Sequence, residues 1–223
     1  MSDVVPNACG KRLDLPQVSL LAVTSVNLEA TIDAIRASVK GIRFAKVKLL
    51  TSLDPGALES DIEHVPITPI RSSSEYSNFI LKELKKHFST SHCLVVQWDG
   101  YALRPGCWKP EFLQYDYIGA RWPQFSDGYC VGNGGFSLRS AKLLEALQSE
   151  RFEPSHPEDV AIGRHNRPML EAHGLSFAPP DLADAFSPER TGDLSQSFGF
   201  HGVWHMPELL GSERFFAVYE TLD

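Results

Sequence analysis

Three short apolar segments in the first hundred residues constrain the fold most, because each of them ends abruptly in polar side chains. They occupy residues 18–25, 47–52 and 93–99, and they end in hydroxyl residues twice and in Asp99 the third time. Segments that are apolar at successive positions are typical of strands buried on both faces of a parallel sheet. Apolar residues at near-helical spacing, from Leu28 to Val39, separate the first two segments. The sequence therefore predicts an α/β fold with a mainly parallel central sheet flanked by helices.

The ends of the predicted strands also indicate where a ligand binds. In open α/β sheets the ligand lies beyond the carboxyl ends of the strands, which is where Thr24, Ser25, Thr51 and Asp99 fall. The remaining predicted elements are a strand near residues 62–67, a helix from an N-cap at Ser74 to about Phe88, and helices near residues 141–148 and 158–164.

Length and composition favour one compact domain. The chain has 223 residues, of which 43% are apolar, and no repeat or low-complexity linker divides it. We therefore expect a single domain over residues 1–223, with a second half whose aromatic and glycine-rich segments face the substrate.

The charge and the cysteines limit the partners and the location of the protein. A net charge of -7 opposes nucleic-acid binding, which depends on many Lys and Arg contacts to phosphates. No apolar run approaches the roughly 20 residues that cross a bilayer, although contact with a membrane surface stays open. The N-terminus lacks a signal-peptide pattern, and Cys9, Cys93, Cys107 and Cys130 are scattered without a CxxC pair. We therefore expect a cytoplasmic protein with reduced cysteines, located in the cytoplasm or at the inner face of the membrane.

Each residue that can carry chemistry also has a purely structural interpretation. Asp99 can hold a hard divalent cation, but Asp-Gly is also a common turn pair. Glu158 and Asp159 follow a proline at the start of a helix, where they can cap the helix or one can act as a general base. His201 can be a ligand or a packed residue. The glycine-rich segment 132–140 either approaches a ligand closely or is a turn without function.

Several common site types are disfavoured by the sequence. Segment 132–140 lacks the Lys-Ser/Thr pair of a P-loop and is not a GxGxxG fingerprint. No HExxH motif or Cys/His ligand set accompanies His201 and His205, and no GxSxG motif occurs. These observations argue against P-loop ATP hydrolysis, NAD chemistry, zinc-dependent hydrolysis and a serine hydrolase.

Five short motifs occur in a specific order along the chain. They are Gln97-Trp98-Asp99-Gly100, Tyr117-Ile118-Gly119-Ala120, Gly132-Asn133-Gly134-Gly135-Phe136-Ser137-Leu138-Arg139, Pro157-Glu158-Asp159-Val160 and Phe200-His201-Gly202. This order resembles a bacterial GT-A glycosyltransferase-like family, most of whose members are labelled as a domain of unknown function. The Glu-Asp-Val segment followed by a histidine is also similar to β1,3-galactosyltransferases and Fringe-type enzymes. The resemblance implies one GT-A domain with a nucleotide-binding half at about 17–100 and an acceptor half at about 101–210.

The resemblance implies transfer of a hexose from a nucleotide diphosphate sugar, with a uridine nucleotide, to a glycan or glycolipid acceptor. Asp159 matches the catalytic base, with Glu158 beside it, and this role implies inversion of the anomeric configuration. Asp99 and His201 match the ligands of a divalent cation, Mn²⁺ or Mg²⁺. The Asp-x-Asp motif of such enzymes keeps one aspartate here, because positions 97 and 101 are Gln and Tyr.

The same resemblance implies a donor site and an acceptor site. The implied donor residues are Val23, Thr24, Ser25, Thr51, Tyr76, Ser77, Trp98 and Asp99. The implied acceptor residues are Asn133, Gly134, Gly135 and Trp122.

Two other functions stay open. The reduced aspartate motif is compatible with a non-catalytic module that keeps the fold and binds a nucleotide sugar or a glycan. A nucleotidyltransferase would carry a basic, glycine-rich loop after the first strand, and residues 22–25 are neither basic nor glycine-rich.

Overall fold

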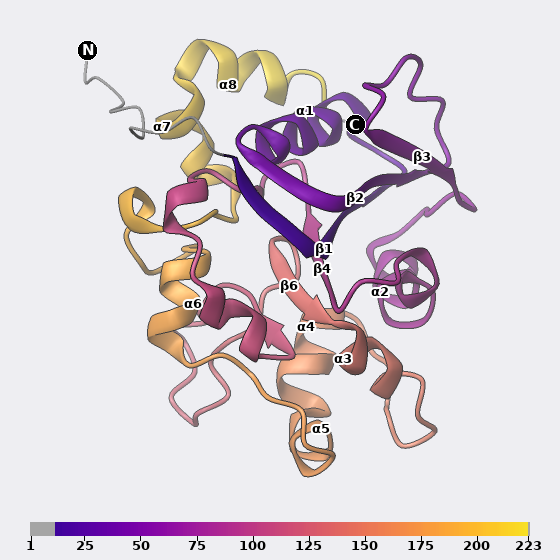
Figure 1. Ribbon diagram of the computed structural model, residues 1–223, viewed down its shortest axis with the longest axis vertical. Coiled ribbons are helices and arrows are strands. Elements are labelled where there is room, and N and C mark those ends of the chain that lie inside the picture. The colour runs from indigo at the N-terminus through magenta and orange to yellow at the C-terminus, as the bar shows by residue number, and fades with distance from the viewer. Residues whose placement is uncertain (1–11, 223) are drawn as a thin grey trace.

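The computed structural model describes residues 12–222, which form one six-stranded sheet flanked by helices (Figure 1). The strands have the spatial order β3-β2-β1-β4-β6-β5, in which the first four are parallel and β6 is antiparallel to both β4 and β5. The predicted α/β fold with a mainly parallel sheet is confirmed. The strands are β1 (Leu13–Thr24), β2 (Ile42–Thr51), β3 (Ile62–Pro66), β4 (His92–Val96), β5 (Tyr117–Ile118) and β6 (Ser137–Ser140).

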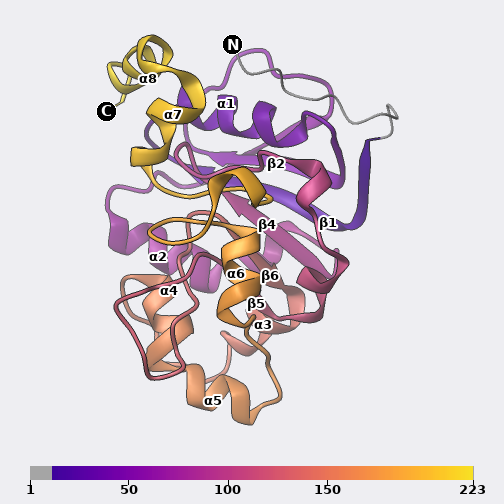
Figure 2. The ribbon, with the colours of Figure 1, turned by 90° about the vertical axis from the view of Figure 1, so that its left-hand side faces the viewer.

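Helices cover both faces of the sheet. In the two ribbon views, α1, α7 and α8 lie on one side and α2 to α5 on the other (Figures 1 and 2). The α-helices are α1 (Leu28–Val39), α2 (Ser73–Lys82), α3 (Ala141–Ala146), α4 (Glu158–Val160), α5 (Arg167–Ala172), α6 (Pro180–Phe186), α7 (Met206–Leu210) and α8 (Ser212–Tyr219). A π-helical turn, η4 (Ala161–His165), continues α4, and 3₁₀ turns occupy η1 (Leu84–His87), η2 (Pro105–Cys107), η3 (Pro110–Gln114), η5 (Leu194–Gln196) and η6 (Val203–His205).

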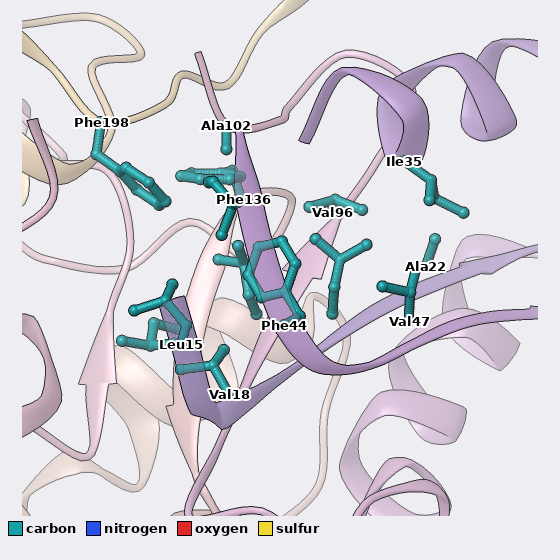
Figure 3. Packing of buried hydrophobic residues seen from close by; sticks show 14 of the residues in the cluster. Leu15, Val18, Ala22, Ile35, Phe44, Val47, Val96, Ala102, Phe136 and Phe198 are labelled. Carbon is teal, nitrogen blue, oxygen red and sulfur yellow. The ribbon is translucent and has the colours of Figure 1, made fainter. Parts of the chain in front are cut away.

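Successive residues of the central strands point to opposite faces of the sheet and so belong to different parts of the core. Leu20 packs with α1 and with aromatic residues of the second half, whereas Leu21 packs with α2, α3 and α5. Figure 3 shows the first of these clusters, with Ile35 of α1 at one end and with Phe136 and Phe198 at the other. The central strands are apolar at successive positions because both of their faces are covered.

The start of α2 differs from the prediction. Its N-cap is Ser72 rather than Ser74, because the Oγ of Ser72 accepts the amide hydrogen of Glu75 at 3.1 Å. The helix ends at Lys82, and η1 carries the chain on to His87. A serine three residues before a glutamate is the usual capping arrangement.

The cysteines of the described residues form no disulfide. Cys93, Cys107 and Cys130 are free thiols. Cys9 lies outside the described residues, as do the other residues of segment 1–11 and residue 223, which the predicted domain includes. No helix between residues 12 and 222 is long and apolar enough to cross a membrane.

Candidate active site

A pocket of about 420 Å³ opens at the carboxyl ends of β1 and β4. Its position is the one at which α/β sheets bind ligands, and its size lies within the range of small-molecule sites. Five predicted donor residues line it, namely Val23, Thr24, Ser25, Tyr76 and Trp98. The other lining residues are Val26, Asn27, Thr31, Ile70, Arg71, Ser72, Ser73 and Gln97.

Hydrogen bonds fix two of the polar groups in this pocket. The hydroxyl of Ser25 accepts the amide hydrogen of Ile70 at 2.9 Å, which ties the end of β1 to the segment before α2. The hydroxyl of Tyr76 accepts a hydrogen bond from Nε2 of Gln97 at 2.9 Å. Burial raises the pKa of Tyr76, so the phenol stays protonated. Arg71 adds a positive charge to the lining.

Three predicted donor residues, Thr51, Ser77 and Asp99, do not line the pocket. Thr51 is fully buried, and its hydroxyl accepts the amide hydrogen of Leu53 at 3.1 Å. Ser77 is also buried, and its hydroxyl donates to Oε2 of Glu158 at 2.9 Å. Both hydroxyls are used inside the protein, so neither Thr51 nor Ser77 contributes to the lining of this pocket.

Asp99 lies beside the pocket, in a tight turn directly after β4. The backbone groups of Gln97 and Gly100 close this turn with two hydrogen bonds of 3.0 Å. The turn lies beside the segment that carries His201, because the amide of Gly202 donates to the carbonyl oxygen of Asp99 at 2.9 Å. Residues about one hundred positions apart in the chain are thus neighbours.

Two carboxylates face the imidazole ring of His201. Its Nε2 lies 3.6 Å from Oδ1 of Asp99, and its Nδ1 lies 3.7 Å from Oε1 of Glu189. The side chains of Asp99 and His201 keep 16% and 15% of their surface exposed, so a ligand can reach both. The sequence-based prediction missed Glu189, which lies in a segment without a recognisable motif.

For both Asp99 and His201, burial and the charge of the other residue shift the pKa in opposite directions, and the net shift is upward. Burial raises the pKa of Asp99, and the nearby His201 opposes the increase. Burial lowers the pKa of His201, but Glu189, Asp99 and Asp159 together raise it above its usual value. The adjacent Gly134 and Gly135 lie against Glu158 and His201, respectively, so the start of α4 is close to the segment that carries His201.

Glu158 and Asp159 are neighbours in sequence but have different surroundings. Glu158 is 6% exposed, and its Oε1 lies 3.5 Å from Nη2 of the fully buried Arg139. Asp159 is only partly buried, and its Oδ1 accepts its neighbour's amide hydrogen, that of Val160, at 2.8 Å. Burial raises the pKa of Asp159, and the charge of Glu158 raises it further. Of the two carboxylates, that of Asp159 is partly exposed, whereas that of Glu158 is buried beside Arg139.

The glycine-rich segment brings the backbone very close to these side chains. A β-carbon at Gly135 would lie 2.0 Å from Nε2 of His201, and one at Gly134 would lie 2.3 Å from Oε1 of Glu158. Asn133 is buried with a positive φ of 56°, and its Oδ1 accepts the amide hydrogen of Gly135 at 3.1 Å. The backbone of residues 133–135 therefore packs directly against the side chains of His201 and Glu158.

Trp122, a predicted acceptor residue, is 6% exposed. Its ring packs against Gly132, where a β-carbon would lie 1.9 Å from the indole, and against Gly163. The indole of Trp122 is thus packed against two backbone segments, which leaves little of it accessible to an acceptor.

Asp99 and His201 bring two candidate ligand atoms for a cation together but do not form a complete cage. Within residues 12–222, no group of three or more His, Cys, Asp or Glu side chains is arranged to hold a metal ion. Magnesium-like ions often use one or two protein ligands together with phosphates and water, at about 2.0–2.1 Å. Two ligand atoms 3.6 Å apart can share such an ion. The residues present therefore fit a cation that takes its other ligands from a bound diphosphate and from water.

Comparison with known proteins gives one family match and several distant structural similarities. Residues 59–201, more than half of the chain, match the profile of a family described as "Protein of unknown function (DUF5672)". No curated protein sequence matches significantly.

Three solved structures with similar folds are glycosyltransferases. The mannosyltransferase PcManGT of Pyrobaculum calidifontis, solved with GDP-Man and Mn²⁺, has a TM-score of 0.47 and 14% identity, and the alignment covers 77% of this chain and 58% of that one. A glycosyltransferase that takes part in glycosylation of the major capsid of PBCV-1 has a TM-score of 0.49 and 14% identity, with 91% and 98% covered. Apo GlyE of Streptococcus pneumoniae TIGR4 has a TM-score of 0.43 and 13% identity, with 77% and 46% covered. At these scores the similarities carry no functional argument.

Proposed function

The chain belongs to the DUF5672 family, and we propose that it is a GT-A glycosyltransferase that moves a hexose from a nucleotide diphosphate sugar to a glycan or glycolipid acceptor. The observation that carries the proposal is that a pocket of about 420 Å³ lies at one sheet edge beside Asp99 and His201, with Asp159 near them at the start of α4. The order of the sequence motifs supports the same reaction. We also propose that the reaction takes place in the cytoplasm or at the inner face of the membrane.

The nucleotide of the donor, a uridine nucleotide in our proposal, occupies the pocket. Tyr76 and Trp98 offer aromatic surface for the base, while Thr24 and Ser25 lie at the end of β1. Because Trp98 lines the pocket and immediately precedes Asp99, a nucleotide bound there directs its diphosphate towards the Asp99 turn.

Asp99 and His201 hold the divalent cation, Mn²⁺ or Mg²⁺, on the diphosphate. When bound, the cation offsets the negative charge that develops on the departing nucleotide diphosphate. The two protein ligand atoms, 3.6 Å apart, would supply part of the coordination of such an ion, and a bound diphosphate would supply more.

Asp159 acts as the general base. Its carboxylate takes the proton of an acceptor hydroxyl while that oxygen forms a bond to the anomeric carbon. The bond between the anomeric carbon and the diphosphate oxygen breaks, and its electron pair stays on the nucleotide diphosphate. A single displacement of this kind inverts the anomeric configuration. The raised pKa of Asp159 suits the role, because it makes the carboxylate a stronger base.

The test is incubation of the purified protein with UDP-glucose, UDP-galactose and GDP-mannose in the presence and absence of Mn²⁺. Water can replace the acceptor, so we expect slow donor hydrolysis with at least one donor, stimulated by Mn²⁺ in the wild type and no longer stimulated in Asp99→Asn. Tight donor binding without turnover would favour the non-catalytic module. Absence of binding to all three donors would contradict the proposal.

A further inference from the structure

The imidazole of His201 has very little freedom to move. A β-carbon at Gly100 would lie 2.7 Å from its Cδ2, and one at Gly135 would lie 2.0 Å from its Nε2. Its Nδ1 is fully buried and, within residues 12–222, has no hydrogen-bond partner within 3.5 Å. The group that faces Nδ1 is the carboxylate of Glu189, at 3.7 Å. Because the ring is held in place, the position of the proton decides which nitrogen keeps a free lone pair.

Glu189 is anchored through its backbone rather than through its carboxylate. Its carbonyl oxygen accepts the indole hydrogen of Trp204 at 2.9 Å and contacts Nε2 of His205 at 2.7 Å. The preceding carbonyl, that of Pro188, accepts the amide hydrogen of His201 at 3.1 Å. The carboxylate, with its side chain 9% exposed, is left to face His201.

We propose that Glu189 is the positioning residue of His201. Its carboxylate accepts the Nδ1 hydrogen, so that Nε2 carries its lone pair towards Asp99 and the cation. A carboxylate behind a metal-binding histidine fixes the tautomer and the ring orientation, and its loss typically lowers metal affinity by about 10–100-fold. This inference deepens the proposed function and rests on it for the cation, whereas the position of the proton is a property of the protein alone.

Asp99 is the competing acceptor for the proton of His201. Its Oδ1 lies 3.6 Å from Nε2, close to the 3.7 Å that separates Nδ1 from Glu189. A proton on Nε2 would leave the lone pair on Nδ1, which is buried against Glu189 and unable to bind a cation beside Asp99. The two carboxylates therefore specify opposite tautomers, and only that set by Glu189 leaves Nε2 free to act as a ligand.

The first experiment measures Mn²⁺ affinity by electron paramagnetic resonance, with Mn²⁺ alone as the probe. We compare the wild type with Glu189→Gln, which keeps an acceptor oxygen, and Glu189→Leu, which removes it. Both variants retain the carbonyl that holds Trp204 and His205. The matched control is Glu145→Leu, which removes an exposed carboxylate paired with Lys85.

We expect Glu189→Leu to bind Mn²⁺ about 10–100-fold more weakly than the wild type. Glu189→Gln should retain most of the affinity, and the control should retain all of it. Equal affinity in the wild type and Glu189→Leu, or equal losses in both Glu189 variants, would overturn the proposal.

The second experiment locates the proton in the metal-free protein by nitrogen-15 NMR of labelled histidines, at a pH that leaves His201 neutral. The signals of His201 are assigned by their absence from His201→Asn. We expect the proton on Nδ1 in the wild type and on Nε2 in Glu189→Leu. A proton on Nε2 in the wild type, or no change in Glu189→Leu, contradicts the role of Glu189. If the wild type binds no Mn²⁺ either alone or with UDP present, the cation in the proposed function fails, while the NMR result still decides the role of Glu189.

Discussion

The two halves of the molecule place their polar groups by different physical means. In residues 13–96 the polar groups that line the pocket lie at the end of β1 and at the starts of α1 and α2, so regular elements position them. In residues 97–201 the acids and the histidine come from turns and from a short helix, and a buried ion pair and closely approaching glycines hold them. The first arrangement is supported by many apolar contacts, whereas the second depends on a few single contacts. Substitutions in the first half should therefore affect stability, and those in the second half should also affect the site.

The largest expected effect on stability comes from the buried pair of the second half. Arg139→Met leaves Glu158 buried without its cationic partner, so we expect the free energy of unfolding to fall by about 3–5 kcal/mol. Chemical denaturation measures the change. The matched control is Arg36→Met, whose ion pair with Glu59 is half exposed and should cost less than about 1 kcal/mol. Equal losses in both variants would contradict the difference that we draw between the halves.

A substitution in the central strand of the first half should affect stability alone. Leu94 is fully buried in β4, and Leu94→Ala should lower the free energy of unfolding by about 2–5 kcal/mol. We expect the folded fraction to bind donor nucleotide with unchanged affinity, measured by calorimetry well below the unfolding temperature. Leu53→Ala, at a side chain that is 37% exposed, serves as the control. A loss of nucleotide affinity in Leu94→Ala would show that the first half is not an independent support.

The two adjacent glycines of the second half should give different results. The new β-carbon of Gly135→Ala meets Nε2 of His201, whereas that of Gly134→Ala meets Oε1 of Glu158. Displacement of a site group by about 1 Å can cost about 100-fold in rate, so we expect such a loss of Mn²⁺-dependent turnover in Gly135→Ala. Gly134→Ala should act mainly on the free energy of unfolding. Full Mn²⁺ dependence in Gly135→Ala would argue against His201 as a ligand.

The smallest expected effect is a change in pH dependence. A general base works when ionised, so the rate falls as the pH decreases through the pKa of Asp159, which burial and then Glu158 raise above 3.8. Glu158→Gln removes the neighbouring charge and should move the acidic limb of the kcat/KM profile to lower pH. A limb that stays in place or moves to higher pH would mean that another group controls it.

The difference between the halves also explains what the sequence could predict. Helix α1 was predictable from apolar residues at helical spacing, and β4 and the later parts of β1 and β2 were predictable from runs of successive apolar residues. The end of a strand identifies an edge of the sheet but not the direction of each side chain, so Thr51 turns inwards. Ser77 follows the pocket residue Tyr76, but successive helical residues point about 100° apart, which directs Ser77 to Glu158.

The positions of the site residues in the second half could be predicted from the sequence only in part. Asp99 and His201 were paired through a resemblance to known enzymes, and the structure places them 3.6 Å apart. Trp122 is covered because two glycines let the backbone pass across its ring, a contact that no periodicity indicates. Glu189 has no motif around it, and its importance depends on a fold that brings it to His201.

The most direct test of the central claim compares donor turnover and donor binding in the wild type and Asp159→Asn. Asparagine keeps the shape of the side chain but cannot accept a proton in the same way, so we expect turnover of the active nucleotide sugar to fall by about 10²–10⁴-fold. Donor affinity, measured by calorimetry, should stay close to that of the wild type, because Asp159 does not line the nucleotide pocket. Turnover that survives the substitution would contradict the assignment of Asp159 as the catalytic base.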